Sequence, residues 1–262
     1  MELVDSHCHL DFPAFASDRE AILDHCKKLG IRKIIVPGVT RAGWAGLLSL
    51  CSRHSHTLYP ALGLHPLFLK RHNKNDLTEL ASLIAGTRPV AVGEIGLDYY
   101  SPHQDKVLQL YYFDTQLEIA EQAGLPVILH VRKAHDAVLS RLRQRQLKGG
   151  IIHAFNGSLQ QAEQYLASGF KLGFGGAVTY WRAKKLRHLA RQLPLSALVL
   201  ETDAPDMAPV NHHGERNRPD YLPEILETLA RLRNEDPQTI AARTTENIRE
   251  LFPSGTSDPG PE

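Results

Sequence analysis

The sequence contains few cysteines and no long apolar run, and both absences narrow the kind of protein it can be. The three cysteines, Cys8, Cys26 and Cys51, leave one thiol unpaired under any pairing scheme, which argues against a disulfide-stabilised secreted domain. The first residues lack the basic region, long apolar core and small-residue cleavage site of a secretory signal, so we expect a cytoplasmic protein. No apolar stretch approaches the roughly 20 residues that a membrane helix requires, so we expect no membrane association.

The chain also has almost no net charge. It carries 30 Lys and Arg against 29 Asp and Glu, a formal net charge of +1 at pH 7. This balance argues against a broad positive surface for long nucleic acids. It is compatible with a local basic pocket, because the charges nearest a substrate act on it most strongly. With 262 residues, of which 42% are hydrophobic, the chain can bury a large core.

Short apolar runs alternate with longer amphipathic stretches along the chain. The runs begin near residues 3, 33, 58, 90, 127, 150, 170 and 197. Strands that alternate with helices through short links pair in parallel, and eight such units fit the size of a (β/α)8 barrel. We therefore predict an α/β fold, a single-domain (β/α)8 TIM barrel over residues 1–253, followed by a disordered tail over 254–262. A doubly wound open sheet is the alternative, but no glycine-rich phosphate fingerprint follows the first run.

Two histidines follow the first apolar run. If the strand continues through them, His7 and His9 point to the same face, because residues i and i+2 of a strand share a face. Two imidazoles placed in this way are typical of half a divalent-metal site. Cys8 would then point to the opposite face, as a small buried apolar side chain.

Further candidate ligands stand at the ends of other apolar runs, where burial without a partner would be costly. The ends of parallel barrel strands meet on the catalytic side, so these groups should converge there. A tetrahedral site needs three or four protein ligands, so six candidates favour two cations. The six predicted metal ligands are His7, His9, Glu94, His130, His153 and Asp203.

Glu94 is the natural bridge between the two cations, since a carboxylate has two oxygens. We predict His7, His9 and Asp203 around one cation and His130 and His153 around the other. Water activated there is the expected nucleophile, and Asp203 is also a candidate to accept its proton. The mixed nitrogen and oxygen donors suit zinc, manganese, iron or cobalt better than magnesium, which they do not exclude.

Three other residues are candidates for supporting roles. His65, beside Pro66, is predicted to bind a phosphate oxygen or to protonate a leaving group. Arg132 offers a guanidinium to phosphate, with a surface salt bridge as the alternative interpretation. Glu201 lies on the strand that leads to Asp203 and is expected to contact a metal ligand without binding the metal itself.

Six short motifs occur in order: DSHCHLD at 5–11, GLHP at 63–66, GEIGLDY at 93–99, HVR at 130–132, HAFNG at 153–157 and ETDAP at 201–205. Together they resemble the TatD-type metal-dependent hydrolases, TIM-barrel members of the wider amidohydrolase group. The resemblance covers residues 1 to 252 approximately and implies the same six metal ligands. It also implies a metal-dependent deoxyribonuclease that acts from DNA ends. The chain departs from the family pattern at Ala154, Asn156 and Arg218, which leaves the substrate open.

We therefore predict a hydrolase with two divalent cations per chain that cleaves phosphodiester bonds in DNA. Hydrolysis of a carboxylic ester, amide or lactone is the alternative within enzymes, because the same nucleophile attacks a carbonyl carbon. A metal-containing binding protein without catalysis is the alternative from another class. Six ligands on an open face argue against it, because structural metal sites are normally closed. No obligate protein partner is predicted.

Overall fold

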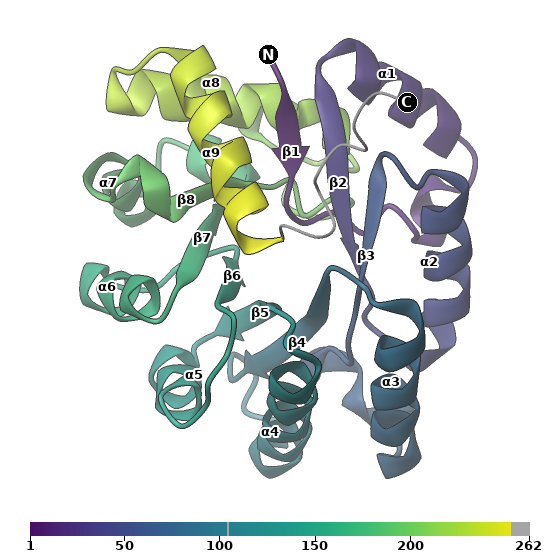
Figure 1. Ribbon diagram of the computed structural model, residues 1–262. Coiled ribbons are helices and arrows are strands. Elements are labelled where there is room, and N and C mark those ends of the chain that lie inside the picture. The colour runs from purple at the N-terminus through teal and green to yellow at the C-terminus, as the bar shows by residue number, and fades with distance from the viewer. Residues whose placement is uncertain (104, 253–262) are drawn as a thin grey trace.

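Eight parallel strands form a barrel inside a ring of helices in the computed structural model, which describes residues 1–103 and 105–252 (Figure 1). The strands pair in chain order, and backbone hydrogen bonds join the two edges, since the N–H of Ser6 donates to the carbonyl of Leu200 over 2.9 Å. This architecture confirms the predicted (β/α)8 barrel. The predicted tail at 254–262 lies outside the described residues. The strands are β1 (Leu3–Asp5), β2 (Ile31–Pro37), β3 (Leu58–Leu62), β4 (Ala91–Asp98), β5 (Val127–Arg132), β6 (Gly150–His153), β7 (Phe170–Phe174) and β8 (Leu198–Leu200).

The helices surround the strands in Figure 1, and none in the described part of the chain combines the length and apolarity needed to cross a membrane. The α-helices are α1 (Arg19–Lys28), α2 (Arg41–Arg53), α3 (Lys74–Thr87), α4 (Lys106–Ala123), α5 (His135–Leu142), α6 (Leu159–Ala167), α7 (Lys184–Gln192), α8 (Leu222–Arg233) and α9 (Pro237–Leu251). The short 3-10 helices are η1 (Pro13–Phe15), η2 (Pro66–Arg71), η3 (Gly176–Thr179), η4 (Leu195–Ala197), η5 (Val210–His212) and η6 (Pro219–Tyr221).

Local sequence signals explain where several of these helices begin and end. Ser158 starts α6 with a capping box: its hydroxyl accepts from the N–H of Gln161, and the Gln161 side chain accepts from the N–H of Ser158. Gly124 ends α4 with a φ of 63°, a left-handed conformation that glycine adopts without steric cost. The loops that follow the strands therefore start and stop at defined positions.

The core has two parts, one inside the barrel and one between the barrel and its helices. The inner part contains one side chain from each of seven strands, and α9 closes it with Ile248 and Leu251. Figure 1 shows α9 lying across this opening of the barrel. The loops at the opposite ends of the strands are therefore free to form a site. The seven strand residues are Val4, Ile35, Ala61, Ala91, Ile128, Ile151 and Val199.

The structure corrects the expected positions of several candidate ligands relative to the strands. β1 ends at Asp5, so His7 and His9 lie in the loop beyond it. The backbone of this loop is held against the adjacent loop after β8, because the N–H of His9 donates to the carbonyl of Ala204 over 2.8 Å. Glu94 is not at the end of its strand, because β4 continues to Asp98.

One further correction concerns the end of a strand, and two other expectations hold. His130 lies inside β5, which extends to Arg132, whereas His153 is the last residue of β6, as predicted. Cys8 is fully buried in the outer core as an unpaired thiol, which confirms the prediction that it serves as a small apolar side chain.

Candidate metal centre

Seven polar side chains converge where the carboxyl ends of the strands meet. A cavity of about 490 Å³ opens over them, and apolar side chains such as Phe12, Phe68 and Met207 form part of its wall. All six predicted metal ligands belong to this cluster, and His65 joins them. The seven residues are His7, His9, His65, Glu94, His130, His153 and Asp203.

Glu94 occupies the centre of the cluster and presents its two oxygens to different imidazoles. Its Oε2 lies 3.2 Å from Nε2 of His7 and 3.4 Å from Nε2 of His9. Its Oε1 lies 3.2 Å both from Nε2 of His65 and from Nδ1 of His130. Burial raises the pKa of this carboxyl, but the imidazoles of His65 and His7 outweigh burial and hold the pKa of Glu94 well below its usual range. Glu94 is therefore a carboxylate with one oxygen available to each half of the cluster.

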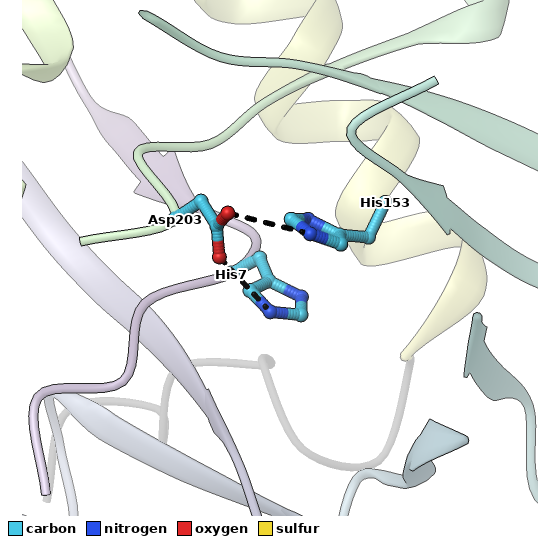
Figure 2. A group of neighbouring side chains, drawn as sticks. All are labelled: His7, His153 and Asp203. Atoms are coloured by element: carbon cyan, nitrogen blue, oxygen red, sulfur yellow. Dashed lines mark ion pairs between the residues drawn. The ribbon is translucent and has the colours of Figure 1, made fainter. Parts of the chain in front are cut away.

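Asp203 connects His7 and His153 on the other side of the cluster, as Figure 2 shows. Its Oδ1 lies 3.6 Å from Nε2 of His7, and its Oδ2 lies 3.6 Å from Nε2 of His153. The two imidazole rings stack with centroids 3.7 Å apart. Burial raises the pKa of Asp203 to about 6, near the working pH at which a carboxylate can serve as a base.

The backbone of Asp203 has a left-handed conformation with a φ of 58°, which costs a non-glycine residue about 1–2 kcal/mol. In this conformation its N–H donates to the carbonyl of His7 over 2.8 Å. The same interaction ties the loop that carries His7 to the loop after β8. The strained backbone of Asp203 therefore allows the hydrogen bond that holds Asp203 next to His7.

These side chains fit a divalent cation. The Nε2 atoms of His7 and His9 lie only 3.2 Å apart and face the same Glu94 oxygen. Burial and the neighbouring His153 hold the pKa of His7 well below its ordinary value, so His7 is neutral and has a lone pair to donate. Its Nδ1 is buried and has no hydrogen-bond partner within the described residues. Three groups have donor atoms within 4.8 Å of one another: His7, His153 and Asp203; His7, His9 and Glu94; His65, Glu94 and His130.

Partners behind the imidazoles determine which nitrogen each one offers to the centre. Nδ1 of His9 lies 3.2 Å from the carbonyl of Pro37, to which it can only donate. Nε2 of His130 lies 3.0 Å from Oδ2 of Asp98. The other nitrogen of each neutral ring is then a lone-pair donor, Nε2 in His9 and Nδ1 in His130.

A carboxylate also lies behind His153, at ion-pair distance but without hydrogen-bond geometry. Its Nδ1 lies 3.2 Å from Oε1 of Glu201, and the same oxygen accepts the N–H of Ala154 over 2.7 Å. Burial disfavours the imidazolium, but Asp203 and Glu201 outweigh burial and raise the pKa of His153 to about 10. The position of Glu201 agrees with the supporting role expected for it.

His65 has the opposite arrangement. The N–H of Leu67 donates to its Nδ1 over 3.2 Å, so the proton of the neutral ring is on Nε2, facing Glu94. Burial lowers the pKa of His65, which keeps the ring neutral. In this state the N–H of His65 is directed at the Glu94 carboxylate, and the phosphate-binding or acid role of His65 stays a prediction.

Arg132 lies at the edge of the cavity, with its guanidinium 3.7 Å from the centre of the Tyr100 ring. Within the described residues it forms no ion pair, in contrast to the surface salt bridge considered above. Sequence reasoning missed Asp98 as the partner of His130. The available signal was an acidic residue four positions after Glu94, on the same face of a strand.

Comparisons with known proteins agree with this geometry. A family model described as TatD related DNase matches residues 4–253. The chain is 42% identical over 253 residues to the metal-dependent hydrolase YjjV of Escherichia coli K12, a match that covers 95% of this chain and 97% of that protein. It is 32% identical over 257 residues to the 3'-5' ssDNA/RNA exonuclease TatD of Erwinia tasmaniensis, covering 95% and 99%.

Solved structures give the same result. The crystal structure of Escherichia coli YjjV, described as a TatD homologue, matches with a TM-score of 0.92 and 40% identity, over 96% of this chain and 98% of that one. A TatD family hydrolase from Entamoeba histolytica shares the fold, with a TM-score of 0.84 and 20% identity over 96% and 98% of the two chains. The chain belongs to the TatD family of metal-dependent hydrolases.

Proposed function

We propose that this protein hydrolyses phosphodiester bonds in DNA, acting from the ends of the strand with two divalent cations. The observation that carries the proposal is the division of the Glu94 carboxylate, whose two oxygens face separate groups of imidazoles 3.2 to 3.4 Å away. A carboxylate in this position suits a bridge between two cations, an arrangement that stabilises both the attacking and the leaving oxygen of a phosphoryl displacement.

The proposed ligand assignment is the one predicted from the sequence. His7, His9 and Asp203 would hold one cation, and His130 and His153 the other, with Glu94 shared. Cations bound there would supply Lewis acidity and lower the pKa of a water molecule toward neutrality. The donor set suits zinc, manganese or a similar ion, and magnesium is a further candidate to be tested.

Three residues of the chain are proposed to act on the substrate or on the attacking water. Asp203, with its pKa near 6, accepts a proton from the attacking water. His65 donates a hydrogen bond from Nε2 to a phosphate oxygen or to the leaving oxygen. Arg132 neutralises phosphate charge at the edge of the cavity. The apolar wall near Phe12 and Phe68 offers a surface for a sugar or a base.

Phosphodiester chemistry is favoured over carbonyl chemistry by two considerations. A neutral ester or amide would leave the Arg132 guanidinium without an anionic partner, whereas every phosphodiester carries a negative charge. The relative from Erwinia tasmaniensis is named as an exonuclease on single-stranded DNA and RNA, and the match covers nearly all of both chains. Nucleic acid ends are therefore the proposed substrate.

A metal-reconstituted activity screen tests the proposal. The chelated protein is loaded in turn with zinc, manganese, cobalt and magnesium, then assayed on end-labelled single-stranded DNA, RNA, a phosphomonoester and a carboxylic ester. Metal-dependent shortening of the DNA is the expected result. Ester turnover without phosphodiester cleavage would support the carbonyl hydrolase instead, and metal binding without turnover of any substrate would support a binding protein.

We further propose that the enzyme works in the cytoplasm without an obligate protein partner. Its three cysteines are buried and unpaired, as expected for a protein kept in a reducing compartment. Burial raises the pKa of each thiol, that of Cys51 to about 12, so none is activated for disulfide exchange.

A further inference from the structure

A second cleft lies directly beside the catalytic cavity. It has a volume of about 570 Å³, within the range of small-molecule sites. It is formed by the end of β5, by the residues that follow β4, β5 and β6, and by residues of α5, α6 and α7. Arg132 and Asn156 line both the cleft and the catalytic cavity. A nucleic acid strand bound in the cavity could therefore extend into the cleft while staying in contact with the protein.

Positive charge is concentrated in this cleft. Arg132, Lys133 and Lys185 line it, against one acidic residue, Asp136. The Asp136 carboxylate already accepts a hydrogen bond from the side chain of Gln161 over 2.8 Å. The cleft thus holds two more positive than negative side chains in a protein whose formal net charge is only +1. Such a local excess attracts an anion, and a phosphate group is an anion of suitable size.

The cleft also contains an exposed aromatic ring that is fixed relative to the metal centre. Tyr100 is 60% exposed, and the Arg132 guanidinium lies over one face of its ring, 3.7 Å from the ring centre, which leaves the other face for a base. The N–H of Tyr100 donates to Oδ1 of Asp98 over 2.9 Å, while Oδ2 of the same carboxylate contacts His130. One buried carboxylate therefore positions both the backbone of Tyr100 and the side chain of a candidate metal ligand.

Asn156 organises the opposite side of the cleft. Its side-chain oxygen lies 3.1 Å from Nε2 of the buried His135, and its side-chain nitrogen donates to the carbonyl of Ala154 over 3.1 Å. Its backbone carbonyl accepts a hydrogen bond from Nζ of Lys185 over 2.9 Å. The Lys185 ammonium is thereby held at the junction with the catalytic cavity and keeps two further N–H donors.

We infer that this cleft, here called the flanking cleft, binds the nucleotide next to the phosphodiester that is cleaved. Lys133 and Lys185 contact its phosphate, Arg132 contacts the phosphates on both sides of it, and Tyr100 stacks on its base. This inference rests on the proposed function. Stacking on an aromatic ring accepts any base and requires an unpaired one, so the flanking cleft selects single strands without reading sequence.

The test compares a long and a minimal substrate. Tyr100→Ala, Lys133→Gln and Lys185→Ala are assayed on a single-stranded pentanucleotide and on bis(4-nitrophenyl) phosphate, which has one phosphate and no neighbouring nucleotide. We expect KM for the pentanucleotide to rise by about 5- to 30-fold in each variant, the loss typical of one stacked base or one charge-assisted contact. The increase for the minimal substrate should be several-fold smaller.

Salt dependence supplies a readout that a purely structural change would not move. Each phosphate contact to a single strand contributes about 0.7 to the slope of log affinity against log salt. Lys133→Gln and Lys185→Ala should each reduce the slope by about this amount, whereas Tyr100→Ala should lower affinity at unchanged slope. The matched controls are Arg191→Ala, which removes an exposed charge that lines a different groove, and Tyr111→Ala, which removes an exposed ring on α4.

The outcomes separate this inference from the proposed function. If DNA is cleaved but the three variants behave like the two controls, the inference is wrong and the proposed function stands. If no phosphodiester is cleaved, the proposed function fails. Binding of a fluorescent pentanucleotide to chelator-treated protein, followed by anisotropy, then tests the cleft directly. Weaker binding by the three variants than by the controls supports the cleft, and equal binding overturns it.

Discussion

The Oδ2 atom of Asp98 lies 3.0 Å from Nε2 of His130. This contact fixes the His130 ring so that its Nδ1 faces Glu94. Asp98→Asn keeps the oxygen that accepts the N–H of Tyr100 but replaces the carboxylate that orients His130. We expect the affinity for the cation near His130 to fall by about 10- to 100-fold, the effect typical of losing such a partner.

To check this expectation, the wild type and Asp98→Asn are titrated with metal, and the melting temperature of each protein is measured in parallel. A structural role alone would lower the melting temperature of the metal-free protein and leave its metal affinity unchanged. Excess metal should restore the activity of Asp98→Asn if the carboxylate acts by positioning His130. Unchanged metal affinity in a folded variant would show that Asp98 does not position His130 for metal binding.

Asp203 is predicted to serve both as a ligand and as the proton acceptor. Asp203→Asn keeps the size and one ligand oxygen but removes the base, so kcat should fall by about 10²–10⁴ with the fold intact. Turnover is measured across the pH range on protein of verified metal content. Near-normal kcat at every pH would exclude Asp203 as the base.

Arg132 distinguishes phosphate from carbonyl chemistry. Arg132→Ala should reduce kcat/KM for a phosphodiester by about 10–10³, equivalent to ~1.4–4 kcal/mol, the worth of one strong or two weaker charge-assisted hydrogen bonds. The rate on any neutral carboxylic ester should change much less, because it offers the guanidinium no charge. Equal losses on both classes of substrate would favour the carbonyl hydrolase.

The sequence was sufficient to predict the barrel because eight apolar runs alternate with amphipathic stretches at regular spacing. It also predicted which side chains meet in the candidate metal centre, but through a partly incorrect geometry. His7 and His9 converge from the loop beyond β1, which is held to the loop after β8, and not from the two-residue repeat of a strand. Glu94 lies inside β4 because the strand continues four residues further than its apolar run suggested.

Contacts between distant segments were not visible in the sequence. Asp98 and His130 are 32 positions apart, and their pairing depends on the register between β4 and β5. The proton position of His65 depends on the backbone turn that places the N–H of Leu67 beside Nδ1. Residue types and spacing predicted which groups meet, whereas hydrogen bonds determined which atom each group presents.

His212, in the loop after β8, forms two ion pairs with carboxylates. Nε2 of His212 lies 2.7 Å from Glu224, its Nδ1 lies 2.9 Å from Glu215, and its ring stacks on Tyr221. Burial disfavours the charged ring, but the two carboxylates outweigh burial and raise the pKa of His212. The stabilisation is therefore fully present below the unfolded pKa of about 6.5 and is lost as the pH rises through the folded value.

His212→Phe keeps the stacking on Tyr221 and removes the ion pairs. We expect its melting temperature to be lower than that of the wild type by about 2–4 °C at pH 6, corresponding to about 1 kcal/mol. The difference should shrink as the pH rises to 10. Thermal unfolding of both proteins over this range measures it. A difference that is independent of pH would show that the charge of His212 contributes nothing.

The measurement that tests the proposed two-cation site most directly is the metal content of the Glu94→Ala variant. If Glu94 is shared, the reconstituted wild type binds two divalent cations per chain, and Glu94→Ala loses affinity at both positions. His7→Ala combined with His9→Ala should empty only one position. Elemental analysis after dialysis against a fixed free-metal concentration gives the stoichiometry of each protein. Two tightly bound cations in a folded Glu94→Ala variant would contradict the bridging role of Glu94.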